Sequence, residues 1–163
     1  MATEQGTIRS RGRFFYVSGA ALAILVMLWG FAKTYFLKTA FGTPEIRPLV
    51  HLHGFVMTLW FTLFFVQSWL VASKRVKLHM RLGMFGAFLA MVLVVVGVAT
   101  GISGARLGHS PGPPPLIFLV VPLGDMLNFT ILIGLGLALR ANREAHRRLM
   151  LLGTLGILTA AIG

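Results

Sequence analysis

Long apolar stretches separated by short polar segments dominate the pattern of this chain. A helix needs about 20 apolar residues to cross the hydrocarbon core of a bilayer, and four stretches approach or exceed that length, with a shorter one at the end. The pattern predicts an all-α transmembrane helical bundle in one domain, residues 14–163, after a polar tail at residues 1–13. The expected spans are residues 14–36, 49–72, 82–102, 116–139 and 147–163, about five in all.

The last stretch is the shortest of the five. Its continuous apolar part runs from Leu149 to Ile162 and stops with the sequence, short of a full crossing. We expect either a partial span or a chain that continues past Gly163 and completes it.

Prolines mark several boundaries of the expected helices. Pro48 precedes the second span, where its missing N–H is harmless in a first helical turn. The proline-rich segment 108–115 cannot be helical and is expected to form a loop. Pro122 lies inside the fourth span and is expected to kink it.

The charge distribution predicts the orientation in the membrane. The chain is 56% hydrophobic and 12% charged, with a net charge of +11, but its basic residues punctuate apolar runs and form no nucleic-acid-binding face. Lysine and arginine stay preferentially on the cytoplasmic side. Four lie on the other side of the expected bundle, so the N-terminus is predicted to be cytoplasmic. The larger group of eleven is Arg9, Arg11, Arg13, Lys74, Arg75, Lys77, Arg81, Arg140, Arg143, Arg147 and Arg148.

Two histidines begin similar segments on the predicted cytoplasmic side. The segments 79–86 and 146–153 share the frame HxRLxxxG. Two imidazoles on separate helices commonly hold the iron of haem b or complete a transition-metal site, so His79, His146 and also His53 are candidate cofactor ligands. Recurrence of a basic collar at two helix starts is the plainer explanation. After His79, a stripe of small residues either lets helices pack closely or makes room for a flat cofactor: Gly83, Gly86, Ala90, Gly97 and Gly101.

Other polar residues within the spans suggest two further sites. Helical spacing places His53 and Gln67 on one face of the second span, whereas His51 points elsewhere. Asp125 is the only acid inside an expected span, with Asn128 one turn away. A carboxylate at that depth must be protonated or paired, and His53 is its expected partner. A metal site of His51, His53 and Asp125 is one hypothesis; a polar path through Gln67, Asp125 and Asn128, or a simple structural hydrogen bond, are others.

Three functions fit these residues. The first is haem b or metal binding for electron transfer or cofactor handling. The second is a small proton-coupled transporter that uses Asp125. The third is a non-catalytic subunit of a larger membrane complex, or a homo-oligomer. Hydrolytic enzymes are not favoured, because the sequence has no cysteine, nucleophile elbow, phosphate-binding loop or HExxH pair.

The motifs HLHGFVMTLWFTLFFVQ, LHMRLG, PLGD and AHRRLM carry a resemblance over residues 51–150. The chain resembles an uncharacterised family of small bacterial polytopic membrane proteins with HxHG, HxRLG and HRRLM motifs. The resemblance implies a location in the bacterial inner membrane, with lipid as the main partner. It also singles out His51, His53, His79, Asp125 and His146 as the motif positions. A looser similarity to b-type membrane cytochromes rests on the histidines at helix ends.

Overall fold

The structure is a computed structural model that describes residues 2–42, 45–109 and 113–162, with side chains described from Phe14 onward. All regular elements in these ranges are helices, which confirms the predicted all-α class. The elements are α1 (Ala2–Gly30), the π-helix η1 (Ala32–Phe36), α2 (Pro48–Ala72), α3 (Val76–Arg106), α4 (Pro115–Phe118), α5 (Val120–Ala138), α6 (Arg143–Gly156) and α7 (Thr159–Ile162).

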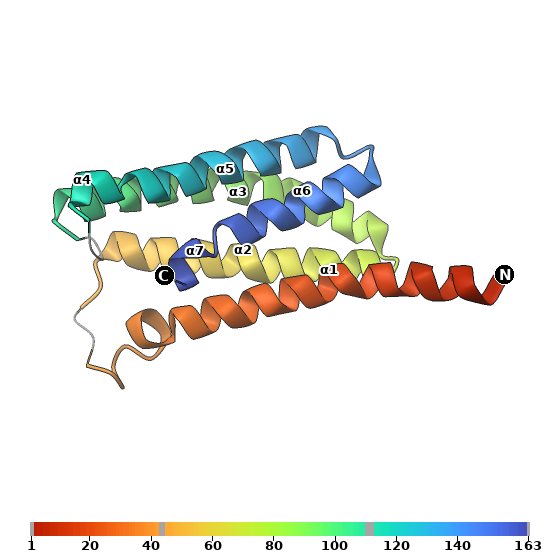
Figure 1. Ribbon diagram of the computed structural model, residues 1–163, viewed down its shortest axis with the longest axis horizontal. Helices are drawn as coiled ribbons and strands as arrows, with labels where there is room; N and C mark the ends of the chain where they lie inside the picture. Colours follow the sequence, from red (N-terminus) through yellow and green to blue (C-terminus); the bar gives the residue numbers. More distant parts are fainter. Residues whose placement is uncertain (1, 43–44, 110–112, 163) are drawn as a thin grey trace.

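The long helices lie side by side along the long axis of the molecule and form a closed ring (Figure 1). Along this ring α1 packs on α2, α2 on α3, α3 on α5 and α5 on α6, while α6 and α7 return to α1. The turns α2–α3 and α5–α6 lie at the same end as the N-terminus. We call this the basic end, because Lys74, Arg75 and Arg140 lie in these turns. The opposite end, which carries the α3–α4 connection, is the proline end.

Three of the described helical segments are long and apolar enough to cross a membrane: Pro48–Ala72, Val76–Arg106 and Pro115–Ala138. They correspond to the second, third and fourth predicted spans. The apolar part of α1 that the structure describes, Phe14–Gly30, is shorter than a full crossing. The helices indicate a membrane protein, whereas the count of five spans and the cytoplasmic N-terminus remain predictions.

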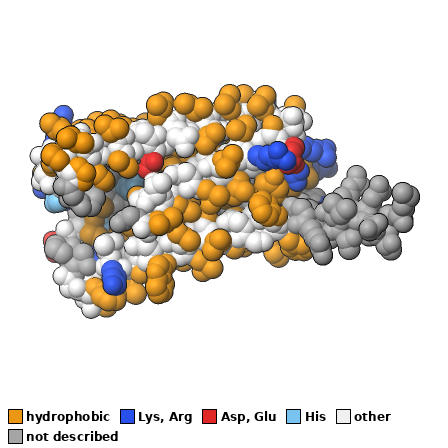
Figure 2. All heavy atoms as spheres, viewed as in Figure 1, with side chains coloured by type: hydrophobic (Ala, Val, Ile, Leu, Met, Phe, Trp, Pro, Cys, Tyr) orange, Lys and Arg blue, Asp and Glu red, His pale blue; other side chains and the backbone are white. Residues whose placement is uncertain are grey.

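The outer surface agrees with contact to lipid. Figure 2 shows hydrophobic side chains over the visible flank of the bundle, with lysine and arginine side chains toward its ends. Trp29 is 86% exposed, Leu116 78% and Met84 75%. Soluble monomers rarely expose contiguous apolar surface on this scale, so the exposed flank is suited to a hydrocarbon environment.

Proline and turn chemistry explain most of the helix boundaries. Pro48 is the first residue of α2, as predicted. The expected kink at Pro122 is a break: α4 ends at Phe118 and α5 restarts at Val120, because Pro122 has no N–H to donate to the preceding turn. Around the expected loop 108–115, the described residues 108, 109, 113 and 114 are not helical, but Pro115 is the first residue of α4, so the loop ends one residue earlier than expected; residues 110–112 lie outside the description.

Two helices end in the same capping arrangement at opposite ends of the bundle. After α2, the N–H of Arg75 donates to Leu70 O at 2.8 Å and that of Lys74 to Val71 O at 3.1 Å. After α3, His109 and Gly108 repeat this pattern. Both are Schellman motifs, which require a residue with positive φ; Gly108 has φ 75° and Lys74 has φ 61°. The tight turn after α2 brings the start of α3 back beside the end of α2.

Candidate cofactor site

His79 and His146 occupy equivalent positions at the starts of α3 and α6. Each is the fourth residue of its helix. Their backbone N–H groups donate to the residue before the helix, Arg75 at 3.1 Å and Asn142 at 2.9 Å. Asn142 also caps α6, because its side chain accepts from two backbone N–H groups of the first turn. The shared HxRLxxxG frame is therefore used at the same helical register in both places.

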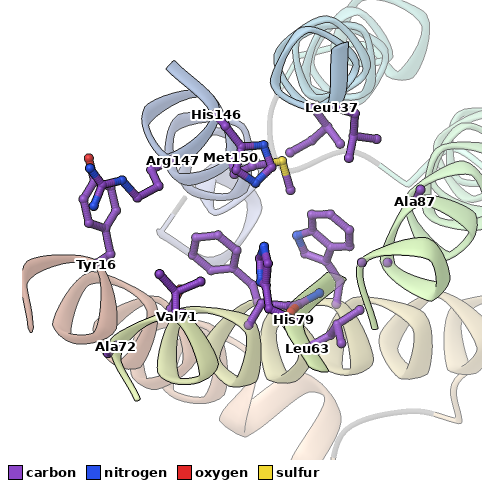
Figure 3. Close-up of a pocket in the computed structure, with 17 residues that line it drawn as sticks. Tyr16, Leu63, Val71, Ala72, His79, Ala87, Leu137, His146, Arg147 and Met150 are labelled. Carbon is purple, nitrogen blue, oxygen red and sulfur yellow. The ribbon is translucent and has the colours of Figure 1, made fainter. Parts of the chain in front are cut away.

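The two histidine rings lie across a cavity from each other (Figure 3). Their ring centroids are 6.3 Å apart and the ring planes are at 79°. The cavity has a volume of about 130 Å³, within about 940 Å³ of empty space that includes the part open to the outside. We call it the histidine cavity. Its lining is Tyr16, Trp60, Leu63, Phe64, Gln67, Ser68, Val71, Ala72, His79, Gly83, Gly86, Ala87, Ile133, Leu137, His146, Arg147 and Met150.

A hydrogen bond fixes the tautomer of His146. Its Nδ1 lies 2.7 Å from the carbonyl oxygen of Gly136, and a carbonyl only accepts, so Nδ1 carries the proton of the neutral ring. This carbonyl is free because α5 ends two residues later and the N–H of Arg140 turns to Leu137 O at 3.4 Å. The other ring nitrogen, Nε2, is left as a lone pair. Metal-bound histidines usually have this arrangement, with the second nitrogen donating to a carbonyl or carboxylate.

Polar atoms without a partner gather around the same cavity. Among the described residues, four buried side-chain N or O atoms have no hydrogen-bond partner. Three of them belong to cavity-lining residues: Trp60 Nε1, Gln67 Oε1 and His79 Nδ1. Buried polar groups are normally satisfied. Three unsatisfied groups around one cavity are the pattern of a site that is completed by a ligand.

The stripe of small residues on α3 divides into two parts. A Cβ at Gly83 would come no closer than 3.8 Å to Gln67, and one at Gly86 no closer than 3.4 Å to Leu63, both ordinary contacts. A Cβ at Gly97 would lie 2.5 Å from the sulfur of Met126, and one at Gly101 would lie 3.3 Å from Pro122. Helix packing therefore explains Gly97 and Gly101. It does not require glycine at positions 83 and 86, which line the histidine cavity.

An aromatic and charged group lies at the edge of the histidine cavity. The guanidinium of Arg147 lies 5.1 Å from the ring centre of Tyr16 and 2.6 Å from a carboxylate oxygen of Glu144. Arg148 donates to the other oxygen of Glu144 at 2.7 Å. The hydrogen bond from Arg148, with that from Arg147, lowers the pKa of the Glu144 carboxyl group, which stays ionised at neutral pH. Positive charge is therefore held beside an otherwise apolar cavity.

His53 does not join the other two predicted ligands. It lines a second cavity of about 220 Å³ toward the proline end, together with Asp125. The expected pairing of His53 and Asp125 stays a prediction, and the structure shows that both line this cavity. Of the three predicted cofactor ligands, the structure brings His79 and His146 together and leaves His53 apart, because His53 is the sixth residue of α2 and lies many turns from the start of α3.

The other predicted polar sites are not assembled. No group of three His, Cys, Asp or Glu side chains in the described part of the chain could hold a metal ion, so the site of His51, His53 and Asp125 is not formed. His51 is exposed and its ring lies 5.6 Å from that of Tyr35. Nor do the polar residues form one path: Gln67 lines the histidine cavity, Asp125 accepts a hydrogen bond from Thr159 at 2.7 Å, and Asn128 is exposed.

Several lining residues escaped the sequence analysis. Tyr16, Arg147 and Met150 face the cavity from α1 and α6, but aromatic, basic and sulfur-containing residues at membrane boundaries usually have other roles. The hydrogen bond that Gly136 accepts from His146 could not be predicted from residue type, because it uses a backbone carbonyl. The sequence indicated only that Gly136 lies just before the end of the fourth expected span.

The fold and the site together describe an α-helical protein with three described helical segments long and apolar enough to cross a membrane and a histidine-lined cavity near the basic end. No family model, no curated protein and no solved structure matches this chain.

Proposed function

We propose that this protein is a membrane haem protein that holds haem b between His79 and His146 and uses it for electron transfer. The observation that carries the proposal is the pair of imidazole rings 6.3 Å apart across a cavity. The spacing leaves room for one metal ion between the rings: an ion bound by a nitrogen of each would lie about 3.1 Å from each ring centre, the sum of a metal–nitrogen bond of about 2.0 Å and roughly 1.1 Å within the ring.

The number of protein ligands favours haem over a bare metal ion. Structural and catalytic zinc sites use three or four protein ligands, and the described residues offer no third His, Cys, Asp or Glu near this pair. Haem iron needs only two axial ligands from the protein, because the macrocycle supplies the rest. The apolar lining and the open positions beside Gly83 and Gly86 suit a flat, largely apolar group.

The residues of the chain supply ligation, orientation and charge. His146 is held in one tautomer by Gly136, so its Nε2 is ready to bind iron without a rearrangement of protons. Arg147 offers a cation at the cavity edge for a carboxylate of the bound group. When bound between two histidines, haem supplies a one-electron couple with no vacant position for oxygen, which is suited to electron transfer.

The same proposal includes a topology. We place the basic end, and with it the histidine cavity, at the cytoplasmic side of a bacterial inner membrane, supported by the excess of lysine and arginine at that end. The five helical stretches would then cross or enter the bilayer in alternation. Fusion of reporter domains to each connection, read for cytoplasmic or external activity, tests this orientation.

An absorption spectrum of the protein purified from its native membrane tests haem binding. The expected result is the sharp α and β bands of six-coordinate, low-spin haem b, with about one haem per chain. His79→Ala and His146→Ala are each expected to lower haem affinity at least about 100-fold, since loss of a first ligand should exceed the ~10–100-fold typical of outer-shell changes. His51→Ala is the matched control and should retain the haem. A colourless protein that also fails to bind added haem would refute the proposal.

Copper is the second candidate, and Met150 is the observation that favours it. Met150 lines the cavity beside His146 (Figure 3), and two histidines with a thioether are soft ligands that suit Cu(I). Met150→Leu separates the two candidates. The substitution should leave haem binding nearly unchanged, whereas it should abolish stoichiometric copper binding if copper is the true occupant.

A further inference from the structure

The cavity near the proline end, which the proposed function does not use, has the composition of a binding site for a small neutral ring. It is formed by α2, α3, α4, α5 and the last turns of the chain, and has a volume of about 220 Å³. Among its described lining residues there is no lysine or arginine. We call it the His53 cavity. Its lining is His53, Met57, Gly97, Thr100, Gly101, Gly104, Ala105, His109, Pro115, Phe118, Leu119, Pro122, Asp125, Met126, Ile157 and Ala160.

The carboxyl group of Asp125 is held in place by the last helical segment. The hydroxyl of Thr159 donates to Asp125 Oδ2 at 2.7 Å. Thr159 is the first residue of α7, and the turn at Ile157 and Leu158 that separates α6 from α7 sets its position. One carboxyl oxygen is thus fixed by the protein, and the group remains able to accept a further hydrogen bond.

An aromatic pair separates the His53 cavity from the histidine cavity. On α2, Met57 lines the first and Trp60 the second, only three residues or about 4.5 Å further along the helix. On α5, Met126 and Ile133 line the two cavities in the same order. Phe129 lies between them in sequence, and its ring packs edge-on against that of Trp60 with centroids 5.0 Å apart. The two cavities are neighbours with one aromatic layer between them.

We propose that the His53 cavity binds a hydroquinone, the reduced form of a membrane quinone. His53 and Asp125 accept hydrogen bonds from its two hydroxyl groups, and the apolar residues Met57, Phe118 and Leu119 contact the ring. An anionic ligand would find no cation here. A bare metal ion would lack a third ligand, because no group of three such side chains forms in the described chain.

The redox step needs the proposed haem as its first electron acceptor, so this part rests on the proposed function, and it needs a second one-electron acceptor, a redox protein that takes electrons from the haem. Oxidation of a hydroquinone to a quinone breaks two O–H bonds and releases two protons and two electrons. The protons pass to the ring nitrogen of His53 and the carboxylate of Asp125. The electrons would leave one at a time, through the layer of Trp60 and Phe129, to the haem held by His79 and His146, and that redox protein would take the first electron from the haem before the second arrives.

Binding can be measured without haem, through the fluorescence of Trp60. The chain has three tryptophans, and Trp29 and Trp69 are exposed on the outside, 86% and 53%. In a Trp29→Phe/Trp69→Phe background, haem-free protein in lipid nanodiscs is titrated, without oxygen and with a reductant present, with the hydroquinone form of a short-chain benzoquinone. The expected result is saturable quenching of Trp60. His53→Ala and Asp125→Leu should each weaken binding at least about tenfold, as expected when a buried hydrogen-bond partner is lost.

Matched variants and a competing cation distinguish binding in the His53 cavity from other causes of the fluorescence change. His51→Ala, two residues from His53 but exposed, should leave the binding constant unchanged; His53→Gln keeps a hydrogen-bond acceptor and should restore part of the affinity. Non-saturable quenching would show only partition into lipid and would overturn the proposal. So would quenching that depends on His79 but not on His53, which would place the ring in the other cavity, or displacement of the hydroquinone by a lipophilic cation held by Asp125. A failure here with an intact haem spectrum leaves the haem proposal standing.

Discussion

The histidine cavity and the His53 cavity share the helices α2, α3 and α5, yet these helices pack differently around them. Toward the basic end, Gly83 and Gly86 of α3 have room for a side chain and face an open cavity. Toward the proline end, a Cβ at Gly97 or Gly101 of the same helix would press against Met126 or Pro122, although both glycines also border the His53 cavity. The small residues therefore allow close packing of α3 on α5 in one half of the stripe, whereas close packing does not require them in the other half.

The comparison also separates two kinds of polar group. Asp125 near the proline end already has a partner in Thr159. The side-chain atoms Trp60 Nε1, Gln67 Oε1 and His79 Nδ1 in the histidine cavity have none. Since burying an unsatisfied polar group costs about 1–3 kcal/mol, the histidine cavity is the part of the fold that gains most from a bound group.

The largest expected effect is the loss of haem binding when a large side chain replaces a glycine that lines the histidine cavity, Gly83 or Gly86. Gly86→Leu places a side chain in the histidine cavity, so haem affinity should fall at least about 100-fold. The free energy of unfolding should change by less than about 1 kcal/mol, because helix propensity favours leucine over glycine. Gly124→Leu is the control, at a glycine with open space that lines neither cavity. Haem titration and thermal unfolding check both values; unchanged haem affinity would refute a cofactor role for this half.

A larger residue at Gly97, where α3 packs closely on α5, should lower stability and leave haem affinity nearly unchanged. Gly97→Val forces the new side chain against that of Met126, which is only 7% exposed and would have to shift within the bundle. Overpacking of this kind usually costs about 1–3 kcal/mol, whereas haem affinity of the folded fraction should stay within about twofold. Denaturant unfolding in detergent, followed by haem titration of the folded protein, measures the two effects separately. Equal stability of Gly97→Val and the unaltered protein would contradict the claim that close helix packing requires a glycine at this position.

The sequence predicted the helices well because their signals are local. Apolar length located the second, third and fourth spans to within about six residues of α2, α3 and the α4–α5 pair. Pro48 and Pro122 act through their own missing N–H, so their effects on helix boundaries were predictable one residue at a time. The HxRLxxxG frame predicted that His79 and His146 have matching positions, because both follow a basic turn at the same register.

The site was only partly predictable, because it depends on distances between helices. His53 and His79 lie in the sequence as equally good ligands, and only the packing of the ring of helices assigns them to different cavities. The split of the glycine stripe depends on whether α5 approaches α3, which it does at Gly97 and Gly101. The Gly136 carbonyl became a hydrogen-bond partner only because α5 ends where it does. None of these features is encoded in the spacing along one helix.

The smallest expected effect concerns the two Schellman motifs at the opposite ends of the bundle. Gly108 takes its φ of 75° without strain, but Lys74 has a Cβ and a φ of 61°. A left-handed conformation costs an ordinary residue about 1–2 kcal/mol, part of which is offset because glycine is more flexible in the unfolded chain. Lys74→Gly should therefore raise the free energy of unfolding by about 0.5–1 kcal/mol, measured by denaturant titration. Lys74→Ala removes the charge and keeps the strain, so it should give no such gain. A stabilisation shared by both variants would assign the cost at this turn to charge repulsion with Arg75 and not to the backbone.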